Sequence, residues 1–402
     1  MLFSLSEYRN RQSFISSPKC GLCRLCTGCK SPSMPPKGEG RKKILLVGEA
    51  PGEREDELNE PFVGESGKFL REILHTFGIR MERDCWKTNA VLCRPPENRT
   101  PTEKEILSCR PNLLKTIQEL NPNGILLLGA VSIKSLIGHL FREKVGNIGI
   151  WAGQVIPNQN PNVWIVPTYH PSYLLRIQNE AAIVLFQKHI RKLLDVCQNK
   201  PWENPPNFSE QVERIYSPSE AAKRIQVWCG KKGRFAFDFE TNTLKPEREK
   251  AAVLSCSVCW WGRETIAFHW TEETKEAVEA LLYSDSEKIA ANLKFEERWC
   301  RHIFGKPVPN WIWDTMLAGH MLCNERGAAG LEFQSFVHLG VPDYSASVEK
   351  YLECSGKSEY NQIKKIPADE LLLYNGLDSL LTYKIFQIQK KLLNHPPYVK
   401  AG

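Results

Sequence analysis

The sequence predicts two domains in one chain, an α/β domain with a mainly parallel sheet followed by an α+β domain. In the first half, short apolar runs alternate with helical patterns, which is typical of strands and helices that build a parallel sheet. In the second half, strand-like runs come first and mostly helical patterns follow. The length of 402 residues also exceeds the size at which a single hydrophobic core usually stops growing.

The apolar run Ile44–Val47 is the clearest strand of the first half, because it ends in the turn-forming sequence Gly-Glu-Ala-Pro-Gly. A helical pattern follows at residues 68–77. Further strands are expected around residues 90–92, 125–128 and 163–166, and further helices at 103–120 and 132–137. Ligands of parallel sheets bind beyond the carboxyl ends of the strands, so we expect a site in the segments that follow them.

Residues 198–219 are rich in Pro, Asn and Ser and lack apolar periodicity, which is typical of a linker. The expected domains are therefore residues 1–197 and 220–402. In the second domain, strands are expected at residues 235–239, 253–261 and 265–270.

The composition is that of an ordinary soluble protein, with 42% hydrophobic and 25% charged residues. No window approaches the run of about 18 apolar residues that a membrane span needs, and the start of the chain lacks the apolar core of a secretory signal. We therefore expect no membrane partner and a cytoplasmic, nucleoid-associated protein. The net charge of +7 favours a polyanionic partner but is compatible with many others.

The cysteines are numerous for a reducing compartment, where disulfides rarely persist, so clustered ones indicate metal ligation. Cys20 and Cys23 form a C-x2-C pair, and Cys93 and Cys109 stand sixteen residues apart further along the chain. Four thiolates suit either zinc or an iron–sulfur cluster. The second C-x2-C pair, formed by residues 26 and 29, is an alternative to the first.

The motifs of the first half occur in a specific order. They are Cys20-x2-Cys23, GEAPGEREDE from Gly48, PFVG from Pro61, Thr88-Asn89, CRPPENR from Cys93, Cys109 and HPSYLLR from His170. In order and spacing, this set resembles the family-4 uracil-DNA glycosylases. The resemblance implies a uracil-DNA glycosylase-like fold, a three-layer α/β domain with a central parallel sheet. It also implies a [4Fe-4S] cluster on Cys20, Cys23, Cys93 and Cys109.

A glycosylase flips its target base into a pocket that stacks the ring and reads the Watson–Crick edge. Phe62 suits the stacking role, and the Asn89 amide offers the acceptor and donor that the N3–H and O4 of uracil require. His170 is the candidate donor to the uracil O2, where negative charge develops. Glu49 is expected near the attacking water or the cationic sugar.

Three further residues complete the uracil-binding set that the resemblance implies. Gly48 lets the backbone approach the base closely. Ala50 stands where the best-known uracil glycosylases carry a water-orienting aspartate, so the group that activates water stays open. Glu55 is expected to crowd the site against the methyl group of thymine.

In the second half, Asp238 and Glu240 are two residues apart on an expected strand and therefore share one of its faces. This arrangement suits Mg²⁺ or Mn²⁺, which prefer oxygen ligands. A D-x-E pattern alone is weak evidence. Two more segments support it: Asn292-Leu-Lys-Phe-Glu296 follows a strand-like run, and Tyr374 and Asp378 lie four residues apart on an expected helix.

This ordered trio resembles the three exonuclease motifs of the proofreading domain in family-A DNA polymerases. The resemblance implies a ribonuclease-H-like α+β fold and 3′–5′ exonuclease activity with two divalent cations. Tyr374 would position the attacking water, and Asn292 and Lys294 would contact DNA. The implied metal-binding residues are Asp238, Glu240, Glu296 and Asp378. Glu296 is a departure, because that family normally has Asp there.

Together these observations indicate a DNA repair or replication enzyme, with uracil-DNA glycosylase and 3′–5′ exonuclease activities. Its expected partners are uracil-containing DNA and single-stranded 3′ ends. One alternative is the glycosylase and proofreading component of a split or truncated family-A polymerase, with a DNA polymerase as partner. A second alternative is a module that binds uracil or DNA ends without cutting.

Overall fold

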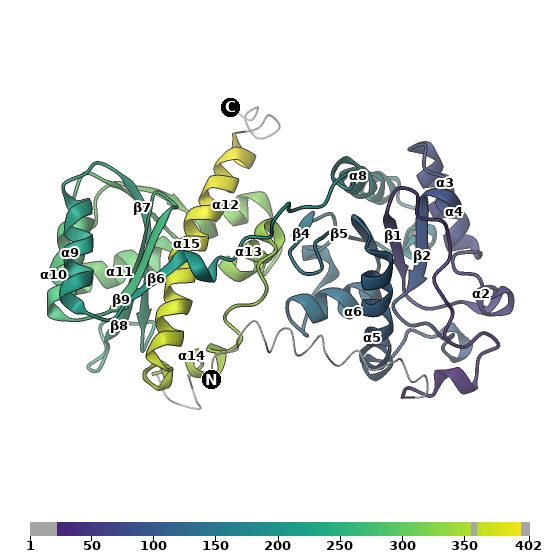
Figure 1. Ribbon diagram of the computed structural model, residues 1–402, viewed down its shortest axis with the longest axis horizontal. Helices are drawn as coiled ribbons and strands as arrows, with labels where there is room; N and C mark the ends of the chain where they lie inside the picture. Colours follow the sequence, from purple (N-terminus) through teal and green to yellow (C-terminus); the bar gives the residue numbers. More distant parts are fainter. Residues whose placement is uncertain (1–21, 355–359, 395–402) are drawn as a thin grey trace. The chain divides into compact units, whose positions relative to one another are not determined.

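The computed structural model describes residues 22–354 and 360–394 (Figure 1). The chain separates into two compact units. Among the described residues, the first unit runs up to Pro205 and includes Phe336–Asp343, and the second comprises Pro206–Ser335 and the residues from Tyr344 onward. In this described part of the chain, no helix is both long enough and apolar enough to cross a membrane.

The first unit is built on a five-stranded sheet in the order β2-β1-β3-β5-β4. All of its pairings are parallel except that of β4 with β5. The mainly parallel sheet that the alternating pattern predicted is thereby confirmed. The strands are β1 (Ile44–Gly48), β2 (Cys85–Asn89), β3 (Gly124–Leu128), β4 (Ile156–Asn158) and β5 (Val163–Thr168).

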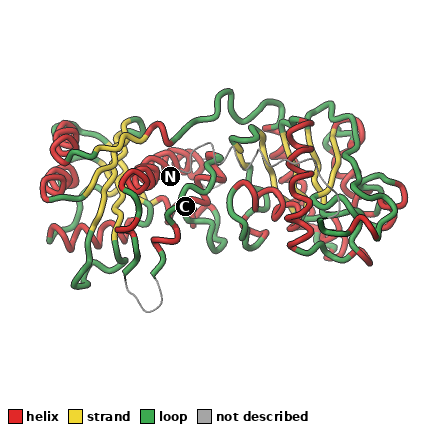
Figure 2. Tube along the Cα trace, turned by 60° about the horizontal axis from the view of Figure 1, so that its bottom comes forward, coloured by secondary structure: helices red, strands yellow, loops and turns green. Residues whose placement is uncertain are grey.

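Helices lie on both faces of this sheet (Figure 2). Ile44 and Leu46 of β1 pack with apolar residues of α3 and α8, while the alternate residues Leu45 and Val47 are also fully buried. Helix α5 begins at a capping box in which Thr102 and Glu105 bond each other's backbone N–H groups. The helices are α2 (Glu53–Leu58), α3 (Glu65–Thr76), α4 (Met81–Asp84), α5 (Glu103–Leu120), α6 (Ala130–Leu140), α7 (Pro171–Ile177) and α8 (Glu180–Val196).

The strand expected at residues 90–92 lies one segment earlier, at β2. β2 was not recognised in the sequence, because Lys87 interrupts its apolar pattern. That lysine is 1% exposed, and its Nζ is 2.8 Å from Oε1 of the partly exposed Glu60, so a buried lysine with a carboxylate partner stands where an apolar side chain was expected. As a result, Asn89 is the last residue of its strand.

The second unit has a six-stranded mixed sheet in the order β11-β10-β7-β8-β9-β6. The central strand β8 is antiparallel to both β7 and β9, and the outer pairings, of β7 with β10, β10 with β11 and β9 with β6, are parallel. This agrees with the expected α+β class. The strands are β6 (Val212–Ile215), β7 (Arg234–Thr241), β8 (Val253–Trp260), β9 (Glu264–His269), β10 (Glu287–Ala290) and β11 (Trp311–Asp314).

Helix α15 crosses one face of this sheet, and α9 and α10 cover the other (Figure 1). Phe235, Phe237 and Phe239 of β7 pack in the core formed with α9 and α10. The alternate residues of β7, including Asp238 and Glu240, therefore face α15. The helices are α9 (Pro218–Cys229), α10 (Glu272–Leu282), α11 (Leu293–Phe304), α12 (Thr315–Leu322), α14 (Glu349–Leu352) and α15 (Ala368–Leu393). Helix α13 (Leu331–Leu339) begins in this unit, and its residues from Phe336 onward belong to the first.

The segment expected to be a linker, residues 198–219, contains regular structure near its end. β6 pairs with β9 as an edge strand, and α9 begins at Pro218. Only Val212 and Ile215 of β6 are buried, so its four residues show too little apolar periodicity to be recognised in the sequence.

Candidate active sites

A pocket of about 850 Å³ lies in the first unit, among the segments that follow the strand ends. The ends of β1, β2 and β5 contribute Glu49, Asn89 and His170, as expected for a parallel sheet. Phe62, from the segment between α2 and α3, also lines it. Ala50 and Glu55 are further lining residues, so the structure brings the expected glycosylase residues together.

Gly48 is the last residue of β1 and lies beneath this pocket. A Cβ at this position would be 2.3 Å from Asn89 Oδ1 and 2.9 Å from Phe62 Cζ. The missing side chain therefore leaves the space in which the Asn89 amide and the Phe62 ring are placed. Phe62 is held in a left-handed backbone conformation, with φ of 62°, and is 5% exposed. A positive φ is uncommon for an aromatic residue and is often found at functional sites.

His170 caps the N-terminus of α7 with its imidazole ring. Its Nδ1 accepts a hydrogen bond from the Ser172 backbone N–H at 3.2 Å, and the Ser172 hydroxyl is 2.7 Å from the same atom. Since Nδ1 accepts, the proton of a neutral ring is on Nε2. Burial, followed by the charge of Arg176, lowers the pKa of His170 to about 4. The ring is therefore neutral near pH 7.

Glu49 and Arg176 both line the pocket. Burial raises the pKa of Glu49, and the charge of Arg176 opposes that increase. Arg176 ends the HPSYLLR motif, but the sequence interpretation gave it no role. Glu55 accepts a hydrogen bond from the Gly52 N–H at 2.7 Å and thereby closes the first turn of α2.

The expected cluster cysteines are only partly covered, because Cys20 lies outside the described residues. Cys29, from the alternative pair, hydrogen-bonds the Cys93 thiol, and the charges of Cys26 and Cys109 act on this pair. Cys23 is half-buried before the short 3-10 helix Leu25–Thr27.

Backbone N–H groups point at the sulfurs of Cys93 and Cys109. Ser33 N donates to Cys93 Sγ at 3.2 Å, and Leu92 N donates to Cys109 Sγ at 3.3 Å. Such bonds stabilise thiolates that ligate iron. Burial raises the pKa of Cys93 to about 12, so a bound cation is what would favour its thiolate form. The donor set fits a cluster.

In the second unit, the structure brings Asp238 and Glu240 of β7 together with Asp378 of α15. Carboxylate oxygens of the three residues lie within 4.8 Å of one another. Burial, and then the charge of Asp238, raises the pKa of Glu240 and of Asp378 well above the usual range. Buried carboxylates this close repel one another unless a cation lies between them, so the group fits divalent metal ions.

Glu296 is not part of this 4.8 Å group but lies close to it. It is 1% exposed, its Oε2 has no hydrogen-bond partner among the described residues, and its pKa is raised by burial and then by Asp238. An unsatisfied buried carboxylate oxygen is itself consistent with a cation nearby. Asn292 caps α11 with φ of 62°, and Lys294 is exposed on the first turn of that helix.

Two tyrosines bond the carboxylate of Asp378. Tyr374, which was expected to position the attacking water, is one of them. The other is Tyr344, which the sequence did not indicate and whose hydroxyl donates to Asp378 Oδ1 at 2.5 Å. The charge of Glu332 acts on Asp238 and Asp378, which places a fifth carboxylate close to the group. Asn375 donates to Asp238 Oδ2 at 3.0 Å. Of these unforeseen residues, only Asn375 lay inside a motif that the sequence had singled out.

Comparison with known proteins relates each unit to one family. Residues 35–196 match the family model described as the uracil DNA glycosylase superfamily, and residues 212–394 match that described as a 3′–5′ exonuclease. A type-4 uracil-DNA glycosylase of Pyrobaculum aerophilum is 40% identical over 161 residues, which cover 39% of this chain and 80% of that protein. A DNA polymerase of Bacillus phage SP01 is 26% identical over 319 residues, which cover 70% of this chain and 33% of the polymerase.

Among solved structures, the catalytic core of RRP6 from Trypanosoma brucei matches at 14% identity with a TM-score of 0.36, over 47% of this chain and 48% of that core.

Both matched families consist of hydrolases, so the class of this protein is a hydrolase with two separate sites. Through its first unit, the chain belongs to the type-4 uracil-DNA glycosylases, and its second unit is a 3′–5′ exonuclease domain.

Proposed function

We propose that the protein excises uracil from DNA in its first unit and removes nucleotides from 3′ ends in its second. The observation that carries the proposal is the pocket in which Phe62, Asn89 and His170 converge above Gly48. A stacking ring, an amide and a neutral imidazole donor are what recognition and release of a flipped uracil require.

In this proposal, uracil stacks on Phe62 and its Watson–Crick edge bonds the amide of Asn89. As the glycosidic bond breaks, electrons move to the uracil ring, and the Nε2–H of His170 donates to O2. The hydrogen bonds of Ser172 fix the tautomer that this donation needs. Glu49 lines the same pocket, and its carboxylate would stabilise the cationic sugar; the charge of Arg176 favours its ionised form.

In the second unit, Asp238, Glu240 and Asp378 would hold divalent cations, with Glu296 as an additional carboxylate. Such ions supply an activated water and stabilise the leaving 3′ oxygen. Tyr374 and Tyr344 orient Asp378 through their hydroxyls, and Asn375 orients Asp238. Asn292 and Lys294 remain the proposed DNA contacts beside this group.

For the iron–sulfur cluster, we propose Cys29, Cys93 and Cys109 as ligands, with the fourth from among the other N-terminal cysteines. Cys29→Ser is therefore expected to lose most of the bound iron and the visible absorption of the purified protein. The matched control is Cys197→Ser, a buried cysteine of the same unit outside this group. Iron content per chain measures the result. If Cys29→Ser keeps all of its iron, Cys29 is not a ligand, and the first pair, Cys20 and Cys23, is favoured instead.

A single assay tests both activities. A 3′-labelled strand with one internal uracil is incubated with the purified protein, with Mg²⁺ or with EDTA. We expect uracil release in both conditions and loss of the 3′ label only with Mg²⁺, because only the carboxylate group needs divalent cations. Absence of uracil release would reject the glycosylase proposal, and label loss that persists in EDTA would reject the metal-dependent exonuclease.

A DNA polymerase as partner is a second proposal. The similarity to the phage polymerase covers 70% of this chain, which is more than the exonuclease unit alone can account for. The tagged protein is expected to retain a DNA polymerase from its own cells after nuclease treatment. If only DNA-bridged contacts are found, the two enzymes do not form a complex.

A further inference from the structure

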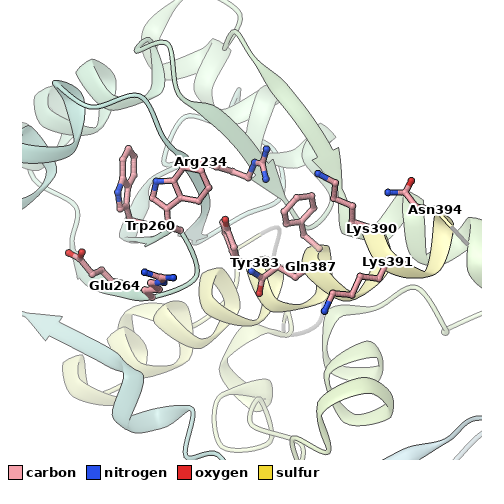
Figure 3. Close-up of a pocket in the computed structure, with 11 residues that line it drawn as sticks. Arg234, Trp260, Glu264, Tyr383, Gln387, Lys390, Lys391 and Asn394 are labelled. Carbon is pink, nitrogen blue, oxygen red and sulfur yellow. The ribbon is translucent and has the colours of Figure 1, made fainter.

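A second pocket, of about 1120 Å³, lies within the exonuclease unit (Figure 3). None of the proposed metal-binding carboxylates lines it. It is bounded by the start of β7, the β8–β9 turn and the last turns of α15. Arg234 and Asp238 lie on the same face of β7, four residues apart. At about 3.3 Å per residue, this places the pocket roughly 13 Å along the strand from the catalytic carboxylates.

Four of the eleven residues that line the pocket are cationic, and only one is acidic. Arg234, Arg263, Lys390 and Lys391 come from three different elements and converge on it. The opposing acids are few. Glu287 is ion-paired with Arg234, and Glu264, which lines the pocket, also lies 3.9 Å from Arg224. The remaining positive charge favours an anionic ligand.

Aromatic rings stand between these cations. The Trp261 indole is 46% exposed, and the Arg234 guanidinium lies 5.8 Å from its ring centroid. Phe386 has Arg234 at 5.3 Å and Lys390 at 5.9 Å from its ring centroid. Tyr383, Gln387, Lys390 and Lys391, which follow one another along α15 in Figure 3, also line this pocket.

The β8–β9 turn holds Trp261 in place. Trp261 has φ of 54°, the next residue is Gly262 with φ of 67°, and Lys384 of α15 donates to the Gly262 carbonyl at 2.8 Å. A tryptophan with a positive φ is uncommon, so the turn fixes an exposed indole at some conformational cost. The core does not need this ring, because the preceding Trp260 already packs on Trp228 at 5.5 Å.

From this combination we propose that the pocket is a second nucleic-acid site, which binds single-stranded DNA. Cations neutralise phosphates, and exposed aromatic faces stack only on bases that are free of a duplex. The amides of Gln387 and Asn394 add neutral donors and acceptors for base edges. The separation of roughly 13 Å from the carboxylates along β7 exceeds the rise of one nucleotide, which is about 3.4 Å even in a stacked duplex. The pocket therefore retains a strand at a point upstream of the 3′ end.

The link to 3′-end removal rests on the proposed function, but the binding itself does not. Binding of a labelled 12-nucleotide oligothymidine is measured in EDTA on the full chain, so that no cleavage occurs. Trp261→Asn is chosen because Asn tolerates a positive φ. It is expected to weaken binding by about 5- to 150-fold, the range for loss of one stacked base.

The second variant reverses two charges, Lys390→Glu with Lys391→Glu. It is expected to weaken binding and to lower the salt slope of log K by about 1.4, at about 0.7 per phosphate contact. The control is Lys231→Glu with Lys232→Glu, an adjacent exposed pair in the same unit that does not line the pocket. Equal binding by wild type and both pocket variants would overturn the proposal. Equal competition by a duplex of the same length would also overturn it.

Digestion kinetics separate this inference from the proposed function. With Mg²⁺, the pocket variants are expected to raise KM for the 12-nucleotide strand and leave kcat unchanged, while a trinucleotide is digested as by wild type. Normal digestion with unchanged KM on both strands would reject the second site and leave the exonuclease proposal intact. If the wild type digests neither strand but the pocket variants still bind the oligothymidine more weakly, only the exonuclease proposal is rejected.

Discussion

Asp238→Asn is expected to reduce removal of 3′ nucleotides by at least about 10³-fold and to leave uracil release unchanged. Asp238 is one of the three residues whose carboxylates lie within 4.8 Å, and its charge acts on Glu240, Asp378 and Glu296. Loss of a metal-binding charge removes several kcal/mol of transition-state stabilisation, and each 1.36 kcal/mol is a factor of ten. Single-turnover digestion of a labelled strand with Mg²⁺ measures the effect.

The matched control is Asp285→Asn, the same chemical change at an exposed position of the same unit. It should digest at the wild-type rate. Equal digestion by Asp238→Asn and wild type would mean that a contaminating nuclease makes the cut.

Metal-free protein gives an independent readout of the same variant. Burial and mutual repulsion raise the pKa values of these carboxyls, so the metal-free wild type loses stability as the pH rises and they ionise; at about pH 9 in EDTA, neutralising one of them is therefore expected to raise the Tm. Addition of Mg²⁺ should then stabilise the wild type more than the variant, because a ligand that binds only the folded state raises its stability. An unchanged Tm in EDTA would mean that the carboxylates are already protonated or solvated.

The glycosylase pocket could be predicted from sequence because its residues are tied to strand ends. Gly48 and Asn89 end β1 and β2, and His170 follows β5 by two residues, so topology alone brings them together. The strand was expected at residues 90–92 instead of at β2, but the predicted position of Asn89 was still correct, because Asn89 lies at the carboxyl end of β2. No role was predicted for Arg176, because its contact with the pocket depends on where the last turn of α7 lies. The motif itself does not indicate that position.

The cluster cysteines, the extra contacts of the carboxylate group and the second pocket could not be predicted, because they depend on tertiary packing that leaves no local sequence pattern. The two C-x2-C pairs have identical spacing, and only the contact of Cys29 with Cys93 distinguishes them. Tyr344 and Glu332 reach the carboxylates from a segment with no motif, more than thirty residues before Asp378. The cationic pocket likewise combines β7, a turn and α15, which are far apart in the sequence.

His170→Ala is expected to slow uracil release by about 10²- to 10³-fold, the usual cost of removing one donor to a developing oxyanion. Digestion of 3′ ends should not change, since that site lies in the other unit. The control is His75→Ala, which removes an exposed imidazole of the same unit at the end of α3. Single-turnover uracil release at pH 7 measures both.

The pH dependence tests how His170 acts. Because burial lowers its pKa to about 4, the imidazole is neutral above about pH 5, and its ionisation should not affect the wild-type rate from there to pH 8. Arg176 lowers the pKa of both His170 and Glu49, so Arg176→Gln raises both values and should move the acid limb of the rate profile to higher pH. If His170 acted as a cation, the wild-type rate would instead rise as the pH falls toward 4, because only then does the ring become protonated.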